Sequence, residues 1–263
     1  MSELQNKVAL VTGASQGIGR AIAFRLARAG AGVALAAMDD VHLEGTFREM
    51  QDLGFRVLRY GVDLTDDGAL DETSSAIIND WGTIDILINN AGIGGPTAPV
   101  HEMPVEGWDR TLAINLRAPF LLSRRFAPAM IKQKSGRIIN ISSIAGKMAY
   151  PLRTPYAASK WALIGLTLTV AQELGPNNIQ VNVICPGPTE TELIESVIRA
   201  RADATGTDYE TMSKEYVKAT ALKRMVKPEE VADLVHFLCS PAAEAITGQA
   251  IDISAGYGFR IGD

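Results

Sequence analysis

Cysteine and histidine are scarce in this sequence. Its 263 residues include two cysteines, Cys185 and Cys239, each in or at the end of an apolar stretch (VNVICPG and LVHFLCS). This placement indicates buried thiols rather than a disulfide or a metal pair, and such thiols fit a reducing compartment. The three histidines, His42, His101 and His236, lack the spacing of metal ligands. The sequence therefore predicts no metal site.

Long hydrophobic runs and an excess of positive charge are also absent. No segment reaches the ~18 uninterrupted apolar residues of a membrane-spanning helix. The beginning of the chain, MSELQNKVALVTG, lacks the charged region, apolar run and cleavage site of a secretory signal. With 25 Lys and Arg against 30 Asp and Glu, the formal net charge is −5, which argues against nucleic acid or an anionic membrane as the main partner. We expect a cytoplasmic protein.

What is present is an alternation of short apolar runs with longer stretches in which apolar residues recur at helical spacing. The runs predict strands at residues 8–11, 33–37, 56–62, 84–88, 137–141, 179–184 and 250–253. The longer stretches predict helices at residues 18–29, 42–53, 70–79, 108–130 and 156–174. This order predicts an α/β fold with one Rossmann-like, doubly wound parallel sheet of about seven strands and helices on both faces. Residues 1–263 are expected to form a single domain.

Residues 190–223 differ from the rest of the chain. They are rich in Glu, Lys, Arg and Thr, contain Gly206 near their middle and offer no strand. This composition predicts one or two mobile helices that cover the site as a lid, where substrate choice is commonly determined.

A glycine-rich segment, TGASQGIG at residues 12–19, lies between the first strand and the first helix of this pattern. Glycines allow the backbone to turn tightly and approach a pyrophosphate, which the free N–H groups and the dipole of a helix N-terminus attract. The spacing G-x-x-x-G-x-G differs from the common dinucleotide fingerprint G-x-G-x-x-G, and no Gly-Lys-Ser/Thr follows as in a P-loop. The strand–turn–helix setting nevertheless favours a dinucleotide site.

Tyr156 and Lys160 stand four residues apart in YAASK, and Ser143 lies thirteen residues upstream in ISSIAG. Side chains four apart share a helix face, so the Lys160 ammonium would lie beside the Tyr156 phenol and favour its ionised form. The phenol could then act as general acid and base, with the Ser143 hydroxyl holding the reacting oxygen. Ser142 is the alternative, but alternation along a strand turns the two serines to different faces. Because such Tyr–Lys pairs also occur on ordinary helix surfaces, the other motifs of the chain have to show whether this pair is catalytic.

Together these motifs resemble the short-chain dehydrogenase/reductase family. The matching elements, in the family's order and spacing, are TGxxxGxG at 12–19, Asp63 in VDLTD, NNAG at 89–92, Asn115, Ser143, YxxxK at 156–160, PG at 186–187 and ITGQ at 246–249. The resemblance covers essentially the whole chain. It implies a nicotinamide-dependent oxidoreductase.

The resemblance implies a role for each candidate catalytic residue. Tyr156 exchanges a proton with the substrate oxygen while hydride moves to or from the nicotinamide. Lys160 binds the nicotinamide ribose hydroxyls and lowers the pKa of Tyr156, and Ser143 hydrogen-bonds the substrate oxygen. Asn115 is expected to bind a water that passes protons from Lys160 to solvent, with an ordinary helix-surface residue as the alternative.

The same resemblance implies a set of cofactor-binding residues. They are Gly13, Ser15, Gln16, Gly17, Ile18, Gly19, Asp39, Asp63, Leu64, Asn90, Ala91, Gly92, Tyr156, Lys160, Pro186, Gly187, Thr189 and Thr191. Asp63 would accept a hydrogen bond from the adenine amino group or, alternatively, cap a helix. Thr189 and Thr191 would meet the nicotinamide carboxamide or, alternatively, cap the lid helix. Asn89 is expected to connect neighbouring strands instead of touching the cofactor.

The residues that discriminate between NAD and NADP are expected just after the second strand, where residues 36–40 read AAMDD. Ala37 stands where the family often places aspartate, so the usual sign of NAD is missing. Neither Met38 nor Gln16 provides the basic group of many NADP users, and Asp39 would repel a 2′-phosphate. The sequence therefore favours NAD over NADP.

The predicted reaction is the NAD(P)-dependent interconversion of a secondary alcohol and a ketone on a small alcohol, polyol or hydroxy acid. The alternative is a 3-oxoacyl-[acyl-carrier-protein] reductase using NADPH, whose acidic partner needs a basic surface. Candidates for that surface are Lys132, Lys134 and Arg137. The predicted lid, however, is acidic at Glu190, Glu192 and Glu195. A catalytically silent sensor or scaffold that binds dinucleotide is disfavoured, because the Ser–Tyr–Lys set is intact.

Arg153 precedes Tyr156 by three residues. It could pair with a substrate carboxylate or phosphate, but a solvated loop arginine is the favoured interpretation.

The helix of residues 161–170 carries an apolar series at Leu163, Leu166 and Val170. The resemblance implies that such helices pair between subunits, so we expect a homo-oligomer, either a dimer or a homotetramer. Burial within one subunit is the competing explanation.

Overall fold

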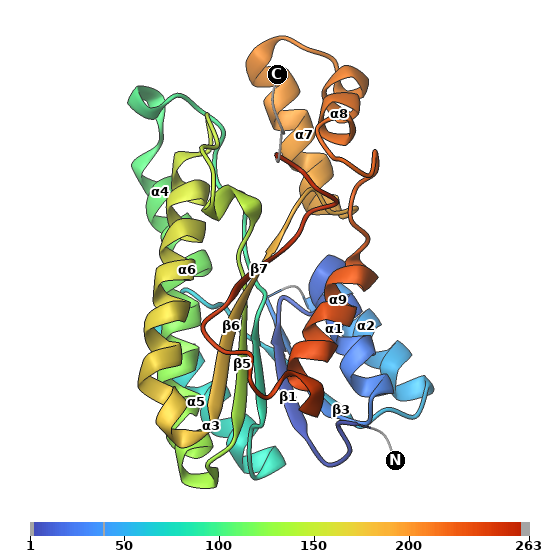
Figure 1. Cartoon of the computed structure of the whole chain (residues 1–263), viewed down its shortest axis with the longest axis vertical. Coiled ribbons are helices and arrows are strands. Elements are labelled where there is room, and N and C mark those ends of the chain that lie inside the picture. The colour runs from blue at the N-terminus through green and yellow to red at the C-terminus, as the bar shows by residue number, and fades with distance from the viewer. Residues whose placement is uncertain (1–2, 39, 259–263) are drawn as a thin grey trace.

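Seven strands form one parallel sheet in the computed structural model, which describes residues 3–38 and 40–258 apart from the side chain of Asp40 (Figure 1). The strands are β1 (Val8–Thr12), β2 (Gly32–Ala37), β3 (Val57–Gly61), β4 (Ile86–Asn89), β5 (Gly136–Ile141), β6 (Ile179–Pro186) and β7 (Ala250–Ile253). Their order across the sheet is β3-β2-β1-β4-β5-β6-β7, and every adjacent pair is parallel. The predicted doubly wound α/β fold is confirmed.

Helices cover both faces of the sheet (Figure 1). On one face lie α1 (Gly17–Arg28), α2 (Asp40–Asp52) and α9 (Pro228–Cys239). On the other face lie α3 (Asp67–Trp81), α4 (Val105–Leu112), α5 (Ala118–Gln133) and α6 (Thr154–Leu174). Single turns of 3₁₀-helix occur at Val100–Glu102, Ile144–Gly146, Gly175–Asn177 and Pro241–Ala243.

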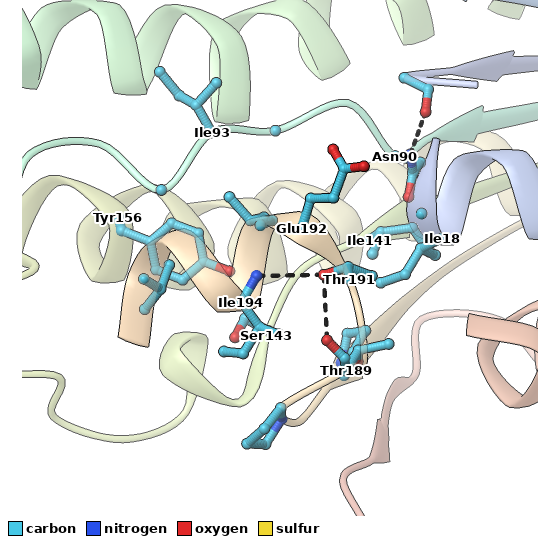
Figure 2. A pocket seen from close by; sticks show the side chains of 18 of the residues that line it. Ile18, Asn90, Ile93, Ile141, Ser143, Tyr156, Thr189, Thr191, Glu192 and Ile194 are labelled. Carbon is cyan, nitrogen blue, oxygen red and sulfur yellow. Dashed lines mark hydrogen bonds between the residues drawn. The ribbon is translucent and has the colours of Figure 1, made fainter. Parts of the chain in front are cut away.

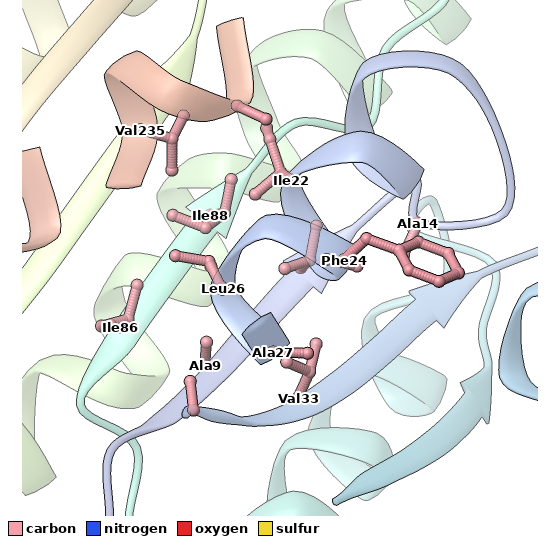
Figure 3. Close-up of a cluster of buried hydrophobic side chains, with 14 of the residues drawn as sticks. Ala9, Ala14, Ile22, Phe24, Leu26, Ala27, Val33, Ile86, Ile88 and Val235 are labelled. Atoms are coloured by element: carbon pink, nitrogen blue, oxygen red, sulfur yellow. The ribbon is translucent and has the colours of Figure 1, made fainter. Parts of the chain in front are cut away.

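The alternation of side chains along each strand divides the core between the two faces. Ala9 and Val11 belong to the cluster that includes α1 and α9, whereas Val8 and Leu10 belong to the cluster that includes α3, α5 and α6. Figure 3 shows the first cluster, with Ile22 of α1 above the strands. Strands buried on both faces have to be almost continuously apolar, which is why the sequence shows apolar runs. This packing fixes the carboxyl ends of the strands, where the cleft lies.

The helical tract predicted over residues 108–130 contains an irregularity. Between the end of α4 and the start of α5, Ala113–Arg117 forms a π-helical turn. The turn contains Asn115, whose side-chain amide donates to the Ile93 carbonyl oxygen and accepts from the Ile93 amide, each over 2.9 Å. These bonds to the loop after β4 draw Asn115 inward and account for the wider turn. The predicted helical tract is thus present as α4, the π-helical turn and α5 in direct succession.

The segment predicted as a lid forms two helices, α7 (Glu192–Thr205) and α8 (Tyr209–Lys218), beyond the carboxyl ends of the strands (Figure 1). Gly206 ends α7 with a φ of 68°, a conformation that glycine adopts without strain. The two helices share a small core of Ile198, Ala202, Met212 and Tyr216. Movement of this pair remains a prediction.

Three further observations concern the described part of the chain. Its helices are all too short or too polar to cross a membrane. Cys185 and Cys239 are buried and unpaired. Within residues 3–38 and 40–258, no group of three or more His, Cys, Asp or Glu side chains is arranged to hold a metal ion.

Candidate active site

A cleft of about 910 Å³ lies between the carboxyl ends of the strands and the α7–α8 pair (Figure 2). Its lining includes these predicted site residues: Gly13, Ser15, Gln16, Gly17, Ile18, Gly19, Asp63, Leu64, Asn90, Ala91, Gly92, Ser143, Tyr156, Lys160, Pro186, Gly187, Thr189 and Thr191. Asp39 lies outside the described residues, and Asn115 is not part of the lining. The fold thus gathers motifs that are far apart in the sequence into one cleft.

The glycine loop packs so closely against the end of β4 and the start of α1 that side chains would not fit at Gly13 and Gly19. Gly13 has a φ of 64°, and a Cβ atom there would lie 2.9 Å from the Ala91 Cα. A Cβ atom on Gly19 would overlap the Gly13 carbonyl oxygen. Gln16, the N-cap of α1, makes no capping bond with its side chain, and the first turn of α1 has no acidic residue. The N–H groups and positive dipole end of α1 therefore suit the pyrophosphate of a dinucleotide.

Asn90 ties the glycine loop to the end of β4. Its Nδ2 donates to the carbonyl oxygens of Thr12 and Gly13, over 2.9 and 3.3 Å. The Thr12 hydroxyl in turn accepts from the amides of Asn90 and Ala91, each over 3.0 Å. Asn89 instead donates to Asn140 on β5 over 2.8 Å, as expected of a residue that connects strands.

Tyr156 and Lys160 lie one turn apart on α6 and line the cleft together with Ser143, which follows β5. Figure 2 shows Tyr156 and Ser143 in this cleft. The Lys160 ammonium is 5.7 Å from the centre of the Tyr156 ring and donates to the Ile141 carbonyl oxygen over 2.8 Å. The Ser142 hydroxyl is buried and donates to the Lys160 carbonyl oxygen over 2.9 Å. The Ser143 hydroxyl instead lies beside the Tyr156 phenol. Its contact with the substrate oxygen remains a prediction.

Burial shifts the pKa of both Lys160 and Tyr156. It lowers the pKa of Lys160 from 10.5 to about 8, so the side chain stays largely protonated at neutral pH. It raises the pKa of Tyr156, and the Ser143 hydroxyl and the Arg153 guanidinium oppose this rise. Desolvation of the phenol outweighs the stabilisation of its ionised form by Ser143 and Arg153. The lowering of the Tyr156 pKa by Lys160 remains a prediction.

Asn115 lies behind the cleft wall and is fully buried. Besides its two bonds to Ile93, its Nδ2 donates to the Ser159 hydroxyl over 3.1 Å. A Cβ atom on Gly92 would lie 3.3 Å from the Asn115 Oδ1 and 3.4 Å from the Lys160 Nζ. The alternative of an ordinary helix-surface residue is therefore wrong: the side chain positions the loop next to Lys160. Its water relay remains a prediction.

Arg153 is 3% exposed and lies at the cleft rather than in solvent. Its guanidinium donates to the Gly94 carbonyl oxygen over 2.7 Å and to the Thr97 hydroxyl over 3.1 Å. Its Cζ atom is 5.7 Å from the centre of the Tyr156 ring. The interpretation as a solvated loop arginine is wrong, because the loop after β4 folds over this side chain.

Comparisons with known proteins agree with this geometry. A family profile described as enoyl-(acyl carrier protein) reductase matches residues 13–258. The chain belongs to the short-chain dehydrogenase/reductase family. The 3-oxoacyl-[acyl-carrier-protein] reductase of Thermotoga maritima is 37% identical over 254 residues, 96% of this chain and 98% of the relative. The D-beta-hydroxybutyrate dehydrogenase of Rhizobium meliloti is 36% identical over 256 residues, 95% of this chain and 98% of the relative.

A solved structure of this family, an NAD+-bound xylitol dehydrogenase, matches with a TM-score of 0.93 at 33% identity. The match covers 97% of this chain and 100% of that one. The protein is therefore an oxidoreductase of the short-chain dehydrogenase/reductase family that acts on CH–OH groups.

Two predicted cofactor ligands of this short-chain dehydrogenase/reductase also make local structural contacts. Asp63 Oδ1 accepts from the amide and the hydroxyl of Thr65, over 2.9 and 2.8 Å, and these bonds lower the pKa of Asp63. Helix α3 is capped by Asp66, so Asp63 is not a helix cap. Thr191 does cap α7, because its hydroxyl accepts from the Ile194 amide over 3.4 Å (Figure 2). The cofactor contacts of Asp63 and Thr191 remain predictions.

Four tyrosines that line the cleft together with Tyr156 were not identified from the sequence. They are Tyr150, Tyr209, Tyr216 and Tyr257. The hydroxyl oxygens of Tyr150 and Tyr216 are 2.8 Å apart, and the rings of Tyr216 and Tyr257 stack with their centres 6.3 Å apart. Tyr150, the α8 pair Tyr209 and Tyr216, and Tyr257 come from three different segments of the chain. The one signal in the sequence is that Tyr209 and Tyr216 belong to the predicted lid.

Proposed function

We propose that this protein is an NAD-dependent dehydrogenase that interconverts a secondary alcohol and a ketone on a small alcohol, polyol or hydroxy acid. One observation carries the proposal: Tyr156 and Ser143 line the same cleft as the glycine loop, with the buried ammonium of Lys160 beside the Tyr156 ring. This arrangement supplies a proton donor and acceptor, a hydrogen-bond donor and a dinucleotide cradle in one place.

The side chains of the cleft account for the proton transfer, while a bound nicotinamide would accept or supply hydride. In the oxidative direction the ionised Tyr156 accepts the proton of the substrate hydroxyl, and Ser143 donates a hydrogen bond to the same oxygen. In the reductive direction the Tyr156 phenol returns that proton. Protonated Lys160 stabilises the ionised phenol electrostatically. Its pKa of about 8 lets it give up a proton more readily than a solvated lysine.

The described residues at the β2 end of the cleft support NAD. Gln16, Ala37 and Met38 line the cleft there. Among the described lining residues, the cationic side chains are Lys160 and Arg153, and both lie beside the Tyr156 ring instead. A 2′-phosphate at the β2 end would therefore find no lysine or arginine in the described lining. NADP is the alternative.

A 3-oxoacyl-[acyl-carrier-protein] reductase using NADPH is the second candidate, because a relative of that name is 37% identical. The basic residues considered for carrier docking do not support it. Lys132 and Lys134 lie around the end of α5, and Arg137 lies at the amino end of β5, whereas the cleft lies at the carboxyl ends of the strands. The Arg137 guanidinium also donates to the Gln180 side chain. A carrier protein bound to these residues would lie at the amino ends of the strands, away from the cleft at their carboxyl ends.

We also propose that residues 190–223 act as a substrate lid and that the protein is a cytoplasmic homo-oligomer, either a dimer or a tetramer. An apolar groove formed by Leu112, Leu116, Phe120 and Leu166 supports the oligomer. Trp161 and Leu168 of α6 are also exposed. Exposed apolar patches of this kind are typical of subunit contacts.

Initial-rate measurements test the proposed reaction. The purified protein is assayed for oxidation of polyols and hydroxy acids with NAD and NADP, and for reduction of 3-oxoacyl thioesters with NADH and NADPH. We expect oxidation of an alcohol with NAD. Reduction of thioesters with NADPH, without oxidation of any alcohol, would overturn the proposal in favour of the second candidate. Cofactor binding with no turnover would favour a silent binding protein.

A further inference from the structure

We propose that Arg153 binds a carboxylate group of the substrate, so that hydroxy acids and the corresponding oxo acids are the substrates of this enzyme. The inference rests on the reaction proposed above and narrows its substrate class.

The guanidinium of Arg153 is buried but only partly paired. It has five N–H groups, and the structure pairs one of them with the Gly94 carbonyl oxygen and one with the Thr97 hydroxyl. Its Nε is buried without a hydrogen-bond partner. Donors therefore remain on a side chain that lines the cleft.

No described carboxylate forms an ion pair with Arg153, and both of its recorded partners are neutral. An ideal Cβ atom on Gly94 would overlap the Arg153 guanidinium and lie 3.5 Å from the Val197 Cγ2, so an apolar side chain of the lid lies close to this part of the loop. A buried charge without a counter-ion is unfavourable. An anionic group of the substrate would compensate it.

The position of Arg153 relative to Tyr156 restricts where this anionic group can stand in the substrate. The Arg153 Cζ is 5.7 Å from the centre of the Tyr156 ring. One small molecule can therefore reach the guanidinium with its carboxylate while its hydroxyl meets Tyr156 and Ser143. This geometry favours a carboxylate within a few bonds of the reacting carbon.

The rest of the cleft lining is mixed in polarity. It includes the apolar side chains of Ile93, Met148 and Val197 and the hydroxyls of Tyr150 and Tyr216. Figure 2 shows Ile93, Ile194 and Tyr156 among the side chains around the cleft. Because these hydroxyls can bind a polyol as well as a hydroxy acid, it is the charge of Arg153, and not the other walls, that favours a carboxylate.

A purely structural role is the competing explanation, since Arg153 holds the loop after β4. Such a role needs hydrogen-bond donors but no charge, whereas carboxylate binding needs the charge. The matched substrates for the test are a short 3-hydroxy acid and its methyl ester. The enzymes are the wild type, Arg153→Met, Arg153→Lys and Thr97→Val, and the last of these removes a loop contact while keeping the guanidinium.

We expect the wild type to prefer the acid over the ester in kcat/KM. Arg153→Met should lose about 100-fold on the acid, mainly through KM, and less than about threefold on the ester. Arg153→Lys should keep part of the preference for the acid, and Thr97→Val should keep all of it. A wild type that favours the ester, or equal losses on both substrates in Arg153→Met, would overturn the inference while leaving the reaction intact.

A binding measurement tests Arg153 independently of turnover, and it decides about the carboxylate site if neither substrate turns over with either cofactor. Sodium malonate should raise the thermal unfolding midpoint of the wild type above that in sodium chloride of equal ionic strength. It should not raise that of Arg153→Met. No malonate effect on the wild type, or the same effect on both proteins, would overturn the carboxylate site.

Discussion

Replacing Lys160 by Met should make the stability of the protein less dependent on pH. The pKa of Lys160 is about 8 in the folded protein, against 10.5 for an ordinary lysine, because the side chain is 4% exposed. A lysine with a lowered pKa binds its proton more weakly in the folded state than in the unfolded state. The free energy of unfolding therefore rises as pH increases from below 8 towards 10.5.

The magnitude follows from this difference in pKa. A fall from 10.5 to about 8 corresponds to about 3 kcal/mol of lost stability at neutral pH. Raising the pH from about 7 to about 9.5 should recover about 2 kcal/mol of this loss. The Lys160→Met variant keeps a side chain of similar length but has no charge to titrate. It also loses the hydrogen bond to the Ile141 carbonyl oxygen, which changes stability by about 1 kcal/mol at every pH.

Urea unfolding of both proteins without cofactor, followed by tryptophan fluorescence, measures this difference. Protein concentration has to be held fixed, because an oligomer couples stability to concentration. We expect the stability of the wild type relative to the variant to increase by about 2 kcal/mol between about pH 7 and pH 9.5. A constant difference across that range would refute the reasoning, since it would mean that the Lys160 ammonium is not desolvated.

Three further substitutions probe other parts of the account. Gly19→Ala places a methyl group against the Gly13 carbonyl oxygen, so calorimetric titration should show cofactor binding weakened by about tenfold or more; unchanged binding would contradict the cradle. Met38→Arg adds a cation at a side chain that is 60% exposed and should lower the KM for NADP by about tenfold. An unchanged ratio of the KM for NADP to the KM for NAD would contradict the placement of the 2′-phosphate beside Met38. Phe120→Glu charges the apolar groove and should yield smaller species in sedimentation; a monomeric wild type would rule out the oligomer.

The inner strands were predictable because they are buried on both faces. Each of them therefore has to be an apolar run, and the run at residues 8–11 became β1 (Val8–Thr12) almost unchanged. The motifs were equally readable, because their spacing is local. Tyr156 and Lys160 share one helix, and the glycine loop joins one strand to the next helix.

The contacts that depend on distant segments were not predictable. Arg153 is buried by Gly94 and Thr97, which precede it by more than fifty residues, so its sequence neighbours gave no sign of burial. The π-helical turn at Asn115 arises from bonds to Ile93 in another loop. The pKa of Tyr156 is raised chiefly by burial, which the four-residue spacing to Lys160 does not show. In each case the sequence shows the residue type but not its surroundings.

The central claim is that Tyr156 transfers the proton, and the Tyr156→Phe variant tests it most directly. Turnover and the dissociation constant of the cofactor are measured on the same preparation, with a hydroxy acid or alcohol that the wild type oxidises. Because the variant lacks the phenol hydroxyl but keeps the ring, we expect turnover to fall by about 1000-fold or more while cofactor affinity stays within about threefold. Turnover within about tenfold of the wild type would contradict the account.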